Sequence, residues 1–325
     1  MKIIRWTVPW LFALLFTAAI AVYQRRSGPT NPIEGTACIA GTVFDYRLER
    51  THSGEGDQPV RVVISDPRVR GWMVWKRFRL DEPLRIVPLE RTGDTLEAFL
   101  PHQPPAGKLE YRVILQCGQE EISLPFGKSA VTRFKGAVPA WALVPHILLM
   151  FAGLITAVRA AWAAVFGGKV RAYAWVTLAL ITFGGLMFGP IVQEFAFGSF
   201  WTGLPFGGDL TDNKTAVMVL VWLIAVWRLK GVKDRRGKRW YAVAAMVVTF
   251  AVYLIPHSMH GSEFDYRKLP PDSLKTSTAT ADPGMTASPD SPPLSLTWGN
   301  QPFILLMLYY DPRCACTVFS SKGAL

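Results

Sequence analysis

The segment EFAFGSFWTGLPFGGDLTDNKT, from Glu194 to Thr215, separates two long apolar runs. It begins with aromatic residues, continues through several glycines and ends in a cluster of charged groups. Aromatic side chains beside polar ones are typical of a membrane–water boundary, where a ring with one polar edge satisfies both environments. We therefore interpret the segment as lying at a membrane edge, with membrane-crossing helices on either side.

The composition also indicates an integral membrane protein. Half of the 325 residues (50%) are hydrophobic, only 18% are charged, and there are 12 Trp. The formal net charge of +11 is not spread evenly, because Lys and Arg gather in short segments beside the apolar runs. We therefore expect a lipid bilayer as the partner of this chain and no nucleic acid.

Five apolar runs approach the roughly 20 residues that cross a hydrocarbon core of about 30 Å. We expect all of them to be helices, because a backbone in lipid must satisfy its own hydrogen bonds. The runs are 6–23, 137–158, 172–192, 211–227 and 240–255. In the fourth, the uninterrupted apolar part from Ala216 to Trp227 spans only about 18 Å. We expect that helix to extend back to Thr211 as its N-cap, with Asp212, Asn213 and Lys214 in its first turn.

The first run has two interpretations. It follows two basic residues, as a secretory signal peptide does, but the sequence after it, QRRSGPTNP, lacks a small-residue cleavage site. We therefore favour an uncleaved membrane anchor over residues 1–26.

Basic residues in the short loops predict the orientation. The connection from Arg228 to Arg239 holds seven Lys or Arg and one Asp, and the loop with Arg159, Lys169 and Arg171 holds no acid. Such loops stay in the cytoplasm. The amino terminus is then cytoplasmic, whereas residues 27–136, the aromatic segment and the carboxyl terminus face outward.

Residues 27–136 predict an all-β domain. Five stretches alternate β-branched or aromatic residues with polar ones, and clusters such as SGEGDQP and QPPAG separate them. The stretches are TACIAGTVFDYRL, PVRVVISD, GWMVWKRFRL, TLEAFLP and KLEYRVILQC. Strands at this spacing favour a β-sandwich, and LPHQPPAGKLEYRV resembles the late hairpin of an immunoglobulin-like domain.

Two cysteines lie on predicted strands of this domain. Cys38 is on the first stretch and Cys117 on the last, in a compartment that is oxidising if the orientation is right. We predict a disulfide between them, with two buried thiols as the alternative.

The chain continues into an outer tail, 259–325. Residues 269–297 are rich in Pro, Ser and Thr and poor in large apolar residues, so we expect them to be disordered. Further on, Cys314 and Cys316 form a C-x-C pair, which suits Cu(I). No other ligand is near in sequence, so we interpret the pair as incidental thiols.

The Glu194–Thr215 segment admits two interpretations. In one, DLTDNK caps a helix, Lys214 pairs with Asp209 or Asp212, and the aromatic residues form an interfacial belt. In the other, the glycines let the backbone fold into a polar pocket at the membrane edge. We favour capping and keep the pocket as the alternative. The pocket candidates are Glu194, Trp201, Asp209, Asp212, Asn213 and Lys214.

Histidines add a metal or heme hypothesis. His146 lies in the second run, and His257 and His260 follow the fifth, all on the predicted outer side. Together with Met259 they offer ligands that suit copper, and two histidines can hold a heme. No pair has the H-E-x-x-H or C-x-x-C-H spacing, so hydrogen-bonding anchors are the simpler interpretation.

Several motifs carry a family resemblance. YQRRSGPTNP, LPHQPPAGKLEY, VPHILLMFAGL, GPIVQEFAFGSFWTGLPFGGDLTDNKT and IPHSMHGSE resemble a family of uncharacterised bacterial inner-membrane proteins, over roughly residues 23 to 265. The resemblance implies the same architecture and a place in the bacterial inner membrane, and it brings no established activity. The Pro/Ser/Thr segment and the CAC ending do not belong to this pattern.

The leading hypothesis is an accessory or binding protein with an outer β-sandwich (27–136), four further helices (137–258) and a polar pocket at the membrane edge. Other membrane or periplasmic proteins are its expected partners. The alternative is a membrane metal- or heme-binding redox subunit that uses the outer histidines. A transporter is less favoured, because no run shows a charge at its middle or a pair of broken helices.

Overall fold

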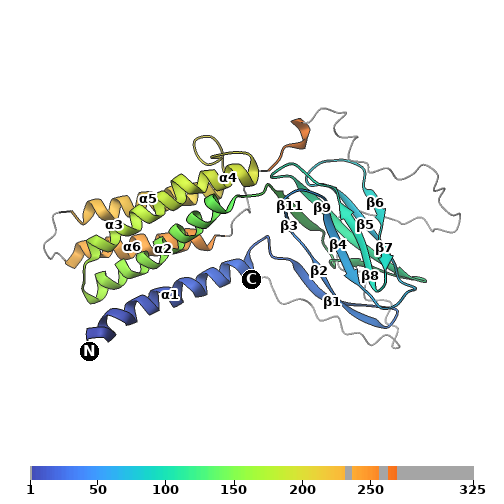
Figure 1. Cartoon of the computed structure of the whole chain (residues 1–325), viewed down its shortest axis with the longest axis horizontal. Helices are drawn as coiled ribbons and strands as arrows, with labels where there is room; N and C mark the ends of the chain where they lie inside the picture. The colour runs from blue at the N-terminus through green and yellow to red at the C-terminus, as the bar shows by residue number, and fades with distance from the viewer. Residues whose placement is uncertain (1, 231–235, 256–262, 269–325) are drawn as a thin grey trace.

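The computed structural model describes residues 2–230, 236–255 and 263–268 (Figure 1). A helical part and a β-sheet part lie side by side, with α1 running along the helical part toward the sheets (Figure 1). The predicted combination of apolar helices with β-sheets is confirmed. Five residues named above lie outside the described residues, as does the stretch 269–297: His257, Met259, His260, Cys314 and Cys316.

The β part consists of two sheets. One has the strand order β1-β2-β4-β8-β7 and the other β3-β11-β9-β5-β6, with β10 beside β9. Neighbouring strands are antiparallel except β3 and β11, which are parallel. The bounds are β1 Ile33–Ile39, β2 Thr42–Leu48, β3 Thr51–Ser53, β4 Gln58–Val63, β5 Arg70–Arg77, β6 Arg85–Pro88, β7 Glu90–Thr92, β8 Thr95–Leu100, β9 Lys108–Cys117, β10 Glu120–Leu124 and β11 Ala130–Lys135.

Alternation along the strands builds one core between the sheets. In β2 every second residue is buried, ending with Phe44, Tyr46 and Leu48, and β9 of the other sheet buries Leu109 and Val113. All five belong to one apolar cluster. Two sheets that share a core form a sandwich. All five predicted stretches form strands, but five other strands were missed. Four of them, β3, β6, β7 and β10, have only three to five residues, which is too few to display a period. The fifth is β11, with six residues.

The predicted disulfide is not formed. Cys38 and Cys117 are present as thiols, and both are half-buried. Cys117 is also not on the last strand, because β10 and β11 follow β9. β9 is an inner strand of one sheet and β1 is an edge strand of the other, so the two cysteines belong to different layers.

Within the described residues, four helical segments are long and apolar enough to cross a membrane: Trp6–Ser27, Ala140–Phe166, Val170–Phe197 and Leu210–Arg228. The third combines α3, a π-helical turn and α4. The described fifth run, α6, is not among them, because basic residues occupy its first turn. The helix bounds are α1 Lys2–Ser27, α2 Ala140–Phe166, α3 Val170–Ile181, η1 Thr182–Phe188, α4 Gly189–Phe197, α5 Leu210–Arg228, α6 Arg236–Leu254 and η2 Tyr266–Lys268.

Small residues let α2, α3, α5 and α6 pack closely. Ala157 and Ala160 of α2, Ala174 of α3 and Ala245 of α6 are buried around Trp222 of α5. The Trp222 indole donates a hydrogen bond to Thr249 Oγ1 of α6 at 2.9 Å. Close approach of small side chains is the usual basis of helix packing in membranes. α6 is therefore an integral member of the bundle although its first turn is basic.

Arg159 was expected in a loop and lies inside α2 instead. The helix continues to Phe166 because the residues after Arg159, AAWAAVF, are apolar and favour helix. The guanidinium donates to Tyr173 Oη at 3.0 Å and stacks on the same ring with 4.5 Å between its Cζ and the ring centroid. The buried Arg159 guanidinium is thus held by Tyr173 of α3.

The helices expose many large apolar side chains. On α1, Trp6 is 66% and Leu15 60% exposed, and on the bundle Leu148 is 64% and Leu223 52% exposed. Apolar surface of this extent marks contact with lipid or with another protein. Together with the four long apolar segments, it is compatible with a place in a membrane.

Backbone and ionic contacts join the two parts. The Gly136 amide, after β11, donates to the Ala196 carbonyl of α4 at 3.0 Å. Beyond α6, Glu263 pairs with Arg79 at 3.1 Å and with Lys108 at 2.6 Å on the β part. The end of α4 is therefore held against the end of the sandwich, and the candidate site forms there.

Candidate functional site

Asp209 begins α5. Its Oδ1 accepts a hydrogen bond from the Thr211 amide at 2.7 Å, so it is the N-cap of the helix. The helix thus includes the polar residues from 211 to 214, as the length argument predicted, while the predicted cap, Thr211, lies two residues after the observed one. The carboxylate is favoured there because an aspartate side chain satisfies the exposed amides of the first turn.

Asp212 fixes the preceding loop. Its Oδ2 accepts from the Thr202 amide at 2.6 Å, the Gly203 amide at 3.0 Å and Gln193 Nε2 at 3.1 Å. A fourth, longer contact comes from Thr202 Oγ1 at 3.3 Å. Asp212 is only 5% exposed, so these donors replace the water that an ionised carboxylate needs. The residue ties α4 and the 198–209 loop to α5.

The two residues after Asp212 hold other segments of the chain. Asn213 Oδ1 accepts from the Leu204 amide at 2.8 Å, which secures the middle of the loop. Lys214 is buried, donates to the Ile255 carbonyl at 2.6 Å, and interacts electrostatically with Asp209. The first turns of α5 therefore lie beside the end of α6.

A π-helical turn positions His146. Gly184, in η1, accepts a hydrogen bond through its carbonyl oxygen from His146 Nδ1 of α2 at 2.8 Å. A carbonyl oxygen only accepts, so Nδ1 carries the proton, and Nε2 of the neutral imidazole holds a lone pair. π-turns of this kind often occur at functional sites. His146 is thereby held in one tautomer.

The close packing around η1 can be tested by a compensating pair. A Cβ on Gly185 would lie 2.5 Å from Thr215 Cγ2 of α5, so Gly185→Ala is expected to destabilise the protein by about 2 kcal/mol. Thr215→Ser removes that methyl group but keeps the hydroxyl that donates to the Thr211 carbonyl at 3.2 Å. The melting temperature in mild detergent should fall in Gly185→Ala and recover in the double variant. Equal values for the two would contradict this packing.

A cavity of about 200 Å³ lies between these elements. His146, Asp209 and Asp212 line it from the bundle, together with Gln193 of α4. Arg133 of β11 enters from the sandwich, with its Cζ 3.9 Å from the centroid of the Phe197 ring. The cavity is therefore built by both parts of the protein.

Arg133 is the positive group of the cavity. It is 4% exposed, and burial lowers the pKa of its guanidinium, while the Asp209 carboxylate acts in the opposite direction, as does Glu263. The two aspartates already accept hydrogen bonds from the loop and the helix start. The cavity lining therefore combines a donor group, the Arg133 guanidinium, with an acceptor atom, His146 Nε2.

The structure brings together only some of the predicted site residues. Asp209 and Asp212 line the cavity, and so does His146, which was predicted for a different site. Trp201 instead covers the loop, with Nε1 donating to the Leu204 carbonyl at 3.1 Å. Glu194 lies outside the cavity lining, and within the described part of the chain its carboxylate has no hydrogen-bond or ion-pair partner. Of the three predicted acidic residues, only Asp209 and Asp212 therefore line the cavity.

Three contributing residues were not predicted: Arg133, Gln193 and Thr202. Thr202 Oγ1 accepts from Gln193 Nε2 at 2.8 Å and contacts Asp209 Oδ2 at 3.1 Å. Gln193 had a signal, because a polar residue within an apolar run needs a partner. Arg133 belongs to another domain, and its proximity is visible only in the tertiary structure.

The described residues provide no set of ligands for the predicted metal or heme. In residues 2–230, 236–255 and 263–268, no group of three or more His, Cys, Asp or Glu is arranged to hold a metal ion. Of the four predicted ligands only His146 is described. Comparisons of the chain with protein-family models, with curated proteins and with solved structures give no match.

Proposed function

We propose that this chain is an accessory or binding protein of the bacterial inner membrane, whose cavity between sandwich and bundle holds one small polar group. The observation that carries the proposal is the shared lining, with Arg133 from β11 facing the same space as His146 of α2 and Asp209 of α5. A ligand there contacts both domains. Binding of the ligand in this cavity therefore couples the outer domain to the membrane bundle.

The ligand class follows from the polar atoms. A guanidinium presents N–H donors, and the lone pair of His146 Nε2 requires a donor, so the ligand carries an oxygen acceptor and an N–H or O–H group. The volume of about 200 Å³ is below the 300 Å³ or so at which pockets for drug-sized ligands begin. A small amide, acid or single side chain of a partner protein fits these limits, whereas a heme macrocycle does not.

Membrane placement rests on surface chemistry. The four apolar segments cross the bilayer in this proposal, and α6 completes a fifth crossing as part of the same bundle. Exposed aromatic residues lie at the bundle end away from the sandwich, including Trp175, Trp227 and Trp240. Trp belts mark the two interfaces of a membrane. With the basic loops in the cytoplasm, α1 is an uncleaved anchor and the sandwich lies outside, with an immunoglobulin-like domain as its proposed class.

Native mass spectrometry of the full-length protein in mild detergent tests the binding role. The wild type is expected to retain a small bound species that Arg133→Gln and His146→Gln each lose, with at least a tenfold drop in occupancy. Arg61→Gln is the matched control, because Arg61 pairs with Glu97 on the surface at 2.5 Å. The proposal fails if occupancy is the same in all four proteins, or if the freshly purified wild type carries no such species.

A metal site is a second candidate, favoured by one contact. Lys214 donates to the Ile255 carbonyl, which places the end of α6 beside the first turns of α5, and His257 lies outside the described residues. His146 Nε2 then offers one imidazole ligand, and copper suits such a site. Metal analysis of the wild type, His146→Ala and the control His102→Ala separates the candidates. Stoichiometric metal lost only in His146→Ala supports the metal site, and equal content in all three contradicts it.

A further inference from the structure

The loop between α4 and α5, residues 198–209, carries exposed apolar side chains at its tip. Leu204 is 73% and Phe206 82% exposed, and Phe200, earlier in the loop, is exposed as well. The loop contains no Asp, Glu, Lys or Arg before Asp209. Large apolar side chains that gather on an uncharged surface mark contact with lipid or with another protein.

The tip is held by the first turn of α5. The Thr202 and Gly203 amides donate to Asp212 Oδ2, and the Leu204 amide donates to Asn213 Oδ1. Side chains of α5 thus serve as the acceptors for consecutive backbone amides of the loop. Acceptors that are fixed within the protein keep these amides bonded where water is scarce.

The turn itself supplies the acceptor for the rest of the tip. The Phe206 and Gly207 amides both donate to the Gly203 carbonyl at 2.9 Å, and Pro205, the residue before Phe206, has no amide hydrogen. Every amide hydrogen from position 202 to position 207 is therefore bonded inside the protein. A loop in water can leave such groups to the solvent, whereas backbone that meets lipid must have its polar groups paired within the protein. The tip fulfils that requirement.

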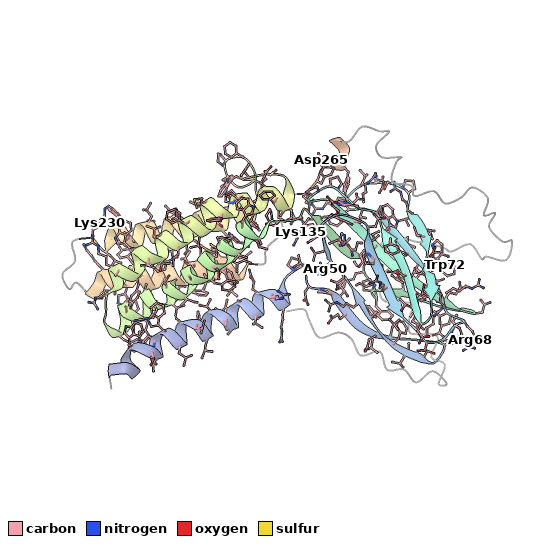
Figure 2. All side chains as sticks on the ribbon, viewed as in Figure 1. Arg50, Arg68, Trp72, Lys135, Lys230 and Asp265 are labelled. Atoms are coloured by element: carbon pink, nitrogen blue, oxygen red, sulfur yellow. The ribbon has the colours of Figure 1, made fainter. Side chains whose placement is uncertain are left out.

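The loop projects sideways from the bundle at the end nearer the sandwich (Figure 1). In the same view Lys135 marks the junction with the sandwich, and Lys230 marks the opposite end of the bundle (Figure 2). A segment that extends away from the helix axes at one end of a membrane bundle lies over the surrounding lipid rather than over the helices. The position of the loop therefore favours lipid as the surface that the tip meets.

Exposed apolar residues continue from the loop onto the helices. Phe195, near the end of α4, is exposed, and its ring lies against the exposed Trp141 of α2, with 5.9 Å between the ring centroids. Phe183 of η1 and Leu220 of α5 are also exposed. Aromatic side chains gather where membrane helices leave the bilayer, and apolar ones cover the helices between the two interfaces. The tip thus extends an apolar surface of the bundle, and one lipid environment covers both.

We propose that residues 198–209 form a membrane-surface anchor, in which Leu204 and Phe206 insert among the lipids of the leaflet on the sandwich side. The backbone of the loop lies at the level of the headgroups, as in other interfacial segments, which bury one apolar face just below that level. Because Asp209 ends the loop and lines the cavity described above, the anchor fixes the cavity at this depth. The proposal rests on the membrane placement of the bundle but not on a ligand in the cavity.

Photo-crosslinking of the full-length protein in bacterial membranes tests the anchor. Single variants carry p-benzoylphenylalanine in place of Phe206 at the tip, Phe183 on the bundle or Val63 on the sandwich. Phe183 is 54% and Val63 57% exposed, so the two comparison positions are matched and lie outside the packed core. Val63 ends β4, and Arg68, which follows shortly after it, marks the end of the sandwich away from the bundle (Figure 2). After irradiation, mass spectrometry of the purified protein distinguishes lipid adducts from protein adducts.

Lipid adducts are expected at positions 206 and 183, and roughly tenfold fewer at position 63, because a sandwich surface in water meets few lipids. Protein adducts without lipid at position 206 overturn the anchor and assign the tip to a protein partner. Lipid adducts at position 183 with none at position 206 overturn it as well, while the bundle stays in the membrane. Absence of lipid adducts at both positions contradicts the membrane placement itself, and the anchor with it. The same results are expected with the crosslinker in place of Leu204, which keeps the test decisive if the Phe206 variant does not fold.

Discussion

Gly207→Ala is expected to lower the melting temperature of the protein in mild detergent by roughly 6 to 12 °C, which corresponds to a loss of about 3 kcal/mol. A Cβ at position 207 would run into the carbonyl oxygen of Thr202. That oxygen accepts from the Asp209 amide at 3.0 Å and cannot move without breaking the turn. The loop would have to open at the point where it is tied to α5.

The neighbouring glycine is the matched control. Nothing lies within 4 Å of a Cβ built on Gly208, and its backbone is outside the left-handed region. Gly208→Ala should therefore leave the melting temperature unchanged or raise it slightly, because alanine lowers the conformational entropy of the unfolded chain. Differential scanning fluorimetry of the two single variants measures the contrast. Similar melting temperatures for the two variants would show that the Thr202 carbonyl oxygen does not pack against Gly207 in the loop.

Asp212→Ala is expected to cost about 3 to 5 kcal/mol, since it leaves several donors without an acceptor. The Thr202 and Gly203 amides and Gln193 Nε2 all donate to Asp212 Oδ2, and Gly203 and Gln193 are buried. Each buried donor left unsatisfied costs about 1 to 3 kcal/mol. Protein level in membranes and melting temperature should both fall.

Asp212→Asn separates structure from ligand binding. An amide oxygen still accepts the loop hydrogen bonds without the charge, so this variant should lie between the wild type and Asp212→Ala in stability. Glu194→Gln, on the adjoining helix and outside the cavity lining, should match the wild type. If Asp212→Asn is as stable as the wild type yet loses the bound species, the aspartate acts on the ligand; if it is as unstable as Asp212→Ala, the charge itself holds the loop.

Some features of the site were predictable from sequence because they are local. A helix too short without Asp212, Asn213 and Lys214 must include them, and α5 does. The capping interpretation and the pocket interpretation were alternatives, but the same residue, Asp209, takes part in both a helix cap and a cavity lining. Asp209 caps α5 and also lines the cavity, since a helix start at a domain junction serves both purposes.

Other features depend on contacts between distant segments. Arg133 and Asp209 are far apart in the chain and share a cavity because contacts such as that of the Gly136 amide with the Ala196 carbonyl join the two parts of the protein. Cys38 and Cys117 were placed on the first and the last predicted strand and expected to pair, yet they fall in different sheets. Strand pairing is a long-range property, so spacing along the chain did not reveal it.

The sequence by itself determined the helices and the longer strands of this protein: apolar length and the backbone's need for internal hydrogen bonds require helices, and alternation of apolar residues requires strands. Only the tertiary structure decided which polar groups meet. Hydrogen bonds such as those of Asp212 with Thr202 and of His146 with Gly184, and the entry of Arg133 between them, need positions correct to a fraction of an ångström. The periodicity of apolar residues in the sequence carries no information at that scale. The close contacts of the glycines with their neighbours, which set these positions, are visible only in the tertiary structure.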